Sequence, residues 1–99
     1  MRRREIPMRA DVFIDKTEGE GVEISVVKHG LSSGAAHKYQ TFEKARTVLV
    51  ALRLDPELID RQLRALSKLP PSVLLRFPAV EIADDVLRSL EFTAAAFQA

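Results

Sequence analysis

The chain contains no cysteine, no tryptophan and only two histidines among its 99 residues. The lack of cysteine excludes disulfides, thiolate metal ligands and cysteine nucleophiles. Small secreted domains usually depend on disulfides, so this absence favours a reducing compartment. No apolar run approaches the ~18 residues of a membrane-spanning helix. The N-terminal arginines are not followed by the apolar stretch of a signal peptide. We therefore expect a cytoplasmic protein with no membrane partner.

The charge of the chain is unevenly distributed although the net charge is only +1. Residues 1–9 carry four arginines against one glutamate, a net charge of +3, whereas residues 10–99 carry 11 basic and 13 acidic side chains, a net charge of −2. Terminal segments of this kind are commonly disordered. We interpret residues 1–9 as a flexible basic N-terminal tail and residues 10–99 as a single small domain, because 46% hydrophobic residues suffice for one core.

Two segments near the N-terminus alternate between apolar and polar residues, which predicts strands with one buried face. They are residues 10–16 and 22–28, and the glycine-rich sequence TEGEG between them suits the turn of an antiparallel hairpin. The expected buried face holds Val12, Ile14, Val22, Ile24 and Val26, and the opposite face holds Asp11, Phe13, Asp15, Glu23, Ser25 and Val27.

The segment HGLSSGAA has the composition of a loop, and residues 37–40 can form a third strand. Thr41 is suited to cap a helix, because its hydroxyl can accept a hydrogen bond from an unpaired backbone N–H. Apolar residues then recur at helical spacing from Phe42 to Leu54, and Val50 and Ala51 widen the apolar stripe. We expect a helix here that is buried on more than one side.

Asp55 and Pro56 predict the start of a second helix, which the Pro70–Pro71 pair ends. Residues 73–77 fit a short strand or a helical turn equally well. The spacing of apolar residues from Ala79 onward predicts a long C-terminal helix. The expected fold is α+β: a small antiparallel sheet, made of the hairpin and a third strand, followed by three helices packed on one face.

The candidate chemical groups are few. His29 and His37 lie beside a serine-containing loop, but sequence proximity alone does not bring a nucleophile and a base together. Their spacing, with Asp11 or Asp15 nearby, matches no familiar set of metal ligands. The acidic residues of 81–85 are typical of a solvated helix face. We therefore predict no catalytic, cofactor or metal site and a protein that is not an enzyme.

The favoured function is binding to another protein, including self-association as a homodimer. Phe13 and Val27 interrupt the polar face of the hairpin, and exposed apolar patches mark partner sites when they are contiguous. The alternative function is nucleic-acid binding, because clustered basic side chains neutralise phosphates. The hairpin face opposes it with three carboxylates, so the candidates lie in the tail and the second helix: Arg2, Arg3, Arg4, Arg9, Arg61, Arg64 and Lys68.

Overall fold

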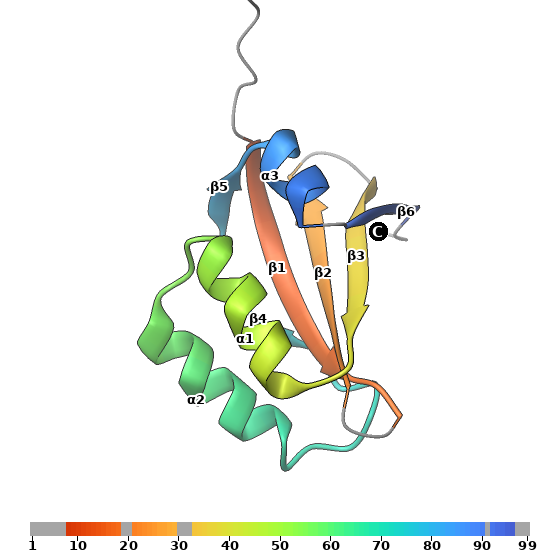
Figure 1. Ribbon diagram of the computed structural model, residues 1–99, viewed down its shortest axis with the longest axis vertical. Helices are drawn as coiled ribbons and strands as arrows, with labels where there is room; N and C mark the ends of the chain where they lie inside the picture. The colour runs from red at the N-terminus through yellow and green to blue at the C-terminus, as the bar shows by residue number, and fades with distance from the viewer. Residues whose placement is uncertain (1–7, 19–20, 30–32, 91, 97–99) are drawn as a thin grey trace, which may run out of the picture.

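A computed structural model describes residues 8–18, 21–29, 33–90 and 92–96 of the chain. It confirms an α+β protein with a small antiparallel sheet (Figure 1). The elements in chain order are β1 (Met8–Lys16), β2 (Val22–Lys28), β3 (Ser33–Tyr39), α1 (Phe42–Ala51), α2 (Pro56–Leu66), β4 (Leu75–Arg76), β5 (Val80–Ile82), α3 (Asp84–Ser89) and β6 (Thr93–Ala96).

The sheet has the strand order β4-β1-β2-β3-β6, and β5 also pairs with β1 beyond β4. β1 and β2 form the expected hairpin around residues 17–21, with Val12 opposite Val26. The strand β3 begins at Ser33, earlier than the expected residues 37–40. Gly34 is required in it, because a Cβ at this position would overlap the carbonyl oxygen of Val26.

The strands have an inner face, which supplies the core, and an outer face directed away from it. Val12, Ile14 and Ile24 of the inner face are fully buried. The helix α1 contacts β2 and β3 and lies in front of the sheet in Figure 1, and α2 packs beside α1. Besides the strands, the core includes Ala45, Leu49, Leu52, Leu54, Ile59, Leu63, Leu66, Phe77 and Leu87.

The predicted helix caps are present. The hydroxyl of Thr41 accepts a hydrogen bond from the N–H of Lys44 at 3.1 Å, and the carboxylate of Asp55 accepts one from the N–H of Glu57 at 3.3 Å. The expectation that α1 is buried on more than one side is wrong, because Val50 is 39% exposed and Ala51 faces solvent. The helix therefore presents a single apolar stripe to the sheet.

The long C-terminal helix predicted from Ala79 onward is wrong. The segment forms the strand β5, the six-residue helix α3 and the strand β6. β5 pairs with the free edge of β1 at Arg9, and β6 pairs with β3 at Ala35. The backbone hydrogen bonds offered by these two edges outweigh the helical spacing of the apolar residues. Three helices packed together on one face are accordingly not observed, and α3 lies near the end of the sheet where β1 begins (Figure 1).

Two further expectations concern the chain ends and the VLLRF segment. Residues 1–7 of the expected tail lie outside the described residues, whereas Met8 and Arg9 belong to β1. In the ambiguous segment 73–77, β4 forms a short strand against β1, and the fully buried Phe77 follows it. None of the described helices is long and apolar enough to cross a membrane.

Candidate functional site

The outer face of the sheet is the candidate site, and it carries Phe13 and Val27. Because Phe13 is opposite Ser25 and Val27 is opposite Asp11, the two apolar residues are diagonal neighbours on β1 and β2. Diagonal neighbours in an antiparallel pair lie about 7–8 Å apart, within reach of an aromatic side chain. Both are half-buried, and the helices α1 and α2 contribute their buried residues to the opposite face. The two residues therefore form one small apolar patch.

Asp11 lies at one end of this patch and holds two basic side chains. Its Oδ1 accepts hydrogen bonds from Nε2 of His29 at 3.1 Å and from Nη2 of Arg76 at 3.0 Å. The hydrogen bond from His29, reinforced by Arg76, lowers the pKa of Asp11 although partial burial opposes this shift. The carboxylate is thus kept ionised and is compensated within the chain.

Asp15 lies at the other end of the patch, next to the hairpin turn, in opposite surroundings. Its Oδ1 is buried and makes no hydrogen bond within the described part of the chain. Its partner across the strands is Glu23, another carboxylate. Burial, followed by the charge of Glu23, raises the pKa of Asp15, while Lys38 acts in the opposite direction. This end of the face therefore carries negative charge that is only partly compensated.

The two histidines lie on opposite faces of the sheet. His29 binds Asp11 on the outer face, whereas His37 is opposite Ile24 on the inner face. There the ring of His37 packs against Tyr39 and Phe92, with centroid distances of 4.7 and 6.5 Å. The histidines cannot share a catalytic or metal site in this arrangement. Among the described residues, no group of three or more histidine or acidic side chains is placed to hold a metal ion.

The basic residues of the nucleic-acid hypothesis fall into separate places. Arg61, Arg64 and Lys68 are exposed on or just after α2. The end of α2 lies near the end of β1, because Nζ of Lys16 donates a hydrogen bond to the carbonyl of Ser67 at 3.4 Å. Arg9 is at the other end of β1, about 23 Å away at ~3.3 Å per strand residue. Arg2, Arg3 and Arg4 lie outside the described residues.

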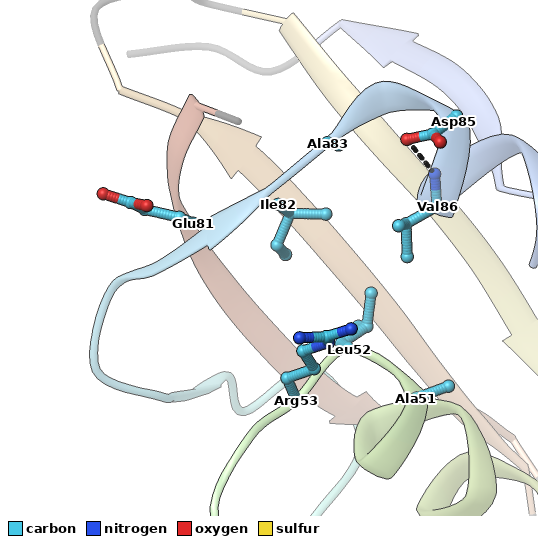
Figure 2. A pocket seen from close by; sticks show the side chains of 8 residues that line it. All are labelled: Ala51, Leu52, Arg53, Glu81, Ile82, Ala83, Asp85 and Val86. Atoms are coloured by element: carbon cyan, nitrogen blue, oxygen red, sulfur yellow. Dashed lines mark hydrogen bonds between the residues drawn. The ribbon is translucent and has the colours of Figure 1, made fainter. Parts of the chain in front are cut away.

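A shallow pocket of about 400 Å³ lies between the end of α1 and the β5–α3 connection. Arg53 enters it from a left-handed backbone conformation (φ 67°), at the position after α1 where glycine is common. Its guanidinium extends across the pocket, while the Glu81 side chain points away and the Asp85 carboxylate accepts a hydrogen bond from the N–H of Val86 (Figure 2). The described lining holds the charged residues Arg53, Glu81 and Asp85 and no histidine or hydroxyl group.

Comparison with known proteins identifies no relative of this chain. No protein-family model matches the chain, and neither a curated protein nor a solved structure matches it. The site therefore rests on its own geometry. Sequence reasoning placed Phe13 and Val27 on one face but missed Arg76, which reaches Asp11 across 65 positions. No local pattern in the sequence indicates that contact.

Proposed function

We propose that the protein is a small non-enzymatic interaction module that binds a protein partner through the outer face of its sheet. The observation that carries this proposal is the joint position of Phe13 and Val27 on a face that the helices α1 and α2 leave uncovered. An apolar patch surrounded by charged residues resembles the organisation of protein interfaces, where apolar side chains occupy the centre and polar ones the rim.

The patch is best tested by changing both apolar residues while keeping strand propensity. Phe13→Thr combined with Val27→Thr removes most of the apolar surface but retains β-branched residues, which favour strands. The matched control is Val50→Thr, which removes the same kind of side chain from the exposed side of α1. Far-UV circular dichroism should be the same for all three proteins, because none of the substitutions removes a fully buried residue.

The binding assay compares proteins retained from a lysate of the source organism by the immobilised wild-type chain and the two variants. A true partner should be reduced about tenfold or more by the double substitution, which corresponds to ~1.4 kcal/mol. The Val50→Thr control should retain the partner as well as the wild type does. Titration calorimetry with the purified partner should reproduce the difference in affinity between the wild type and the double variant. Equal retention by all three proteins, or equal affinities in the titration, would reject the outer face as the binding surface.

Nucleic-acid binding through α2 is the second candidate, and the exposure of Arg61, Arg64 and Lys68 favours it. The chain has no tryptophan and one tyrosine, so co-purifying nucleic acid would dominate its absorption near 260 nm. If α2 binds phosphates, replacing the three basic residues with alanine should weaken binding to a DNA duplex and flatten its dependence on salt. An unchanged salt dependence would exclude this helix.

A further inference from the structure

The charged residues of the outer face divide it into two ends. We call Asp15 and Glu23 the acidic end and Arg9 and His29 the basic end. The acidic end adjoins the hairpin turn, and the basic end lies where β1 begins and β2 stops. Arg9 is exposed and forms no ion pair among the described residues, and His29 is 43% exposed. In the sequence Arg2, Arg3 and Arg4 precede this end of β1 and are separated from it by residues 5–7, which include Glu5.

These two ends are placed symmetrically about the centre of the hairpin. Val12 and Val26 are opposite each other in the register. On β1, Asp15 and Arg9 are each three residues from Val12, in opposite directions. Glu23 on β2 and His29, which directly follows β2, are likewise each three residues from Val26. A rotation that reverses the strand direction about this centre therefore exchanges acidic positions with basic ones.

Two identical sheets that stack face to face can be related by two kinds of two-fold axis. An axis parallel to the strands would place the acidic end of one copy over the acidic end of the other. An axis perpendicular to the strands, passing over the Val12–Val26 pair, places each acidic end over a basic end. Opposed potentials across an interface favour association, whereas like charges in contact disfavour it. The charge layout thus selects the second arrangement.

We infer that the partner of the outer face is a second copy of this chain, stacked with its strands reversed so that each acidic end faces a basic end. The inference rests on the proposed function. Each ionic contact occurs twice, because a two-fold interface uses the same surface on both copies. Phe13 and Val27 lie one residue from the midpoint of their strands, so they occupy the centre of the interface.

The neighbouring charges lie outside the two central strands. Lys38 stands beside Glu23 on β3, and Glu81 stands beside Arg9 on β5. Asp11 is engaged by Arg76 and His29. Along β1 and β2 the remaining ionic contact is Asp15 with the other copy's Arg9, while Glu23 lies over the other copy's His29, whose Nε2 already binds Asp11. The arrangement also gives Asp15, whose charge is only partly compensated within the chain, a basic counterpart.

Paired charge reversals in the full-length chain test this arrangement. Sedimentation equilibrium of the wild type at low salt should give a dimer that weakens as salt screens the charges. Asp15→Lys alone and Arg9→Glu alone should each raise the dimer dissociation constant about tenfold or more, because each creates two like-charge contacts. The double variant restores opposite charges at both contacts and should return to within about threefold of the wild type.

Control reversals on α2 separate this contact from a general effect of net charge. Glu57→Lys and Arg61→Glu make the same charge changes at exposed positions away from the sheet. They should leave the dissociation constant unchanged within about twofold. A rescue by the double variant together with unchanged α2 controls is the decisive result, because the double variant also restores the wild-type net charge and only the controls exclude an effect of net charge.

Three outcomes would overturn the inference. A monomer at all concentrations would exclude a second copy, while the lysate experiment with Phe13→Thr/Val27→Thr would still decide whether the face binds a different protein. A dimer that survives both that double substitution and the charge reversals would use another surface. A dimer strengthened by each single reversal would have the other orientation, in which like ends face each other.

Discussion

Asp11 and Asp15 occupy the same face of β1, but their carboxylates have opposite surroundings. Asp11 accepts hydrogen bonds from His29 and Arg76, and its pKa is lowered. Asp15 has a buried oxygen without a hydrogen bond among the described groups and a second carboxylate opposite it, and its pKa is raised. Two residues of one type, on one strand, therefore make contributions of opposite sign to stability.

The difference indicates that the two ends of the face serve different purposes. Asp11 on β1 binds Arg76 of β4 and His29 after β2. These contacts connect three segments of the sheet. The buried oxygen of Asp15 makes no hydrogen bond among the described residues, and its carboxylate repels Glu23. Like charges directly opposite each other destabilise a strand pair. A group that weakens the isolated fold is better explained by binding than by folding, which agrees with the proposed contact between two copies.

The largest effect in this comparison is expected for Asp11→Ala. The substitution leaves His29 and Arg76 without their common acceptor. Exposed ion pairs contribute about 0.2–1 kcal/mol each, so the free energy of unfolding should fall by about 1 kcal/mol at neutral pH. Urea denaturation followed by circular dichroism measures this change, with Arg61→Ala on α2 as a control. A variant as stable as the wild type would mean that the cluster does not hold the sheet together.

Asp15→Asn should have the opposite and smaller effect. It removes a partly buried charge and its repulsion with Glu23 while keeping the shape of the side chain. We expect the free energy of unfolding to rise by about 0.5 kcal/mol, the middle of the range for cross-strand pairs. Glu23→Gln should give part of the same gain, because it removes the same repulsion. A loss of stability on Asp15→Asn would show that the carboxylate has a favourable partner in solution.

The hairpin and the helix starts were predictable because their signals are local. Alternation placed Val12 and Ile14 in the core and Phe13 on the outer face. Thr41 and Asp55 cap the backbone within two or three residues of themselves. The outer face as a candidate site also followed from this alternation, before any tertiary contact was known.

The remainder depends on contacts between distant parts of the chain. β5 and β6 form because β1 and β3 offer edges to them, and no window around residues 79–96 contains that information. Asp11 and Asp15 look alike in the sequence, since both follow an alternating pattern beside apolar residues. What separates them is Arg76, brought beside Phe13 by β4, together with the strand register that sets Asp15 against Glu23.

The pH dependence of the two substitutions should separate the two carboxylates most sharply. A carboxyl group with a raised pKa binds its proton more tightly in the folded chain, so it favours folding when protonated, and this contribution is lost as pH rises through the folded-state pKa. The advantage of Asp15→Asn should therefore shrink as pH falls towards the ordinary carboxyl value, beginning above 3.8.

Asp11 should respond in the reverse sense. Its lowered pKa means that its stabilising contribution is present above the ordinary value of 3.8 and is lost as pH falls through the lower folded-state pKa. On acidification the gain from Asp15→Asn should disappear first, while the loss from Asp11→Ala persists to lower pH. Thermal denaturation of the three proteins from neutral to acidic pH measures this order. If the stability changes caused by Asp15→Asn and Asp11→Ala disappear over the same pH range, the two carboxylates have the same environment in solution. The outer face would then not have two unlike ends.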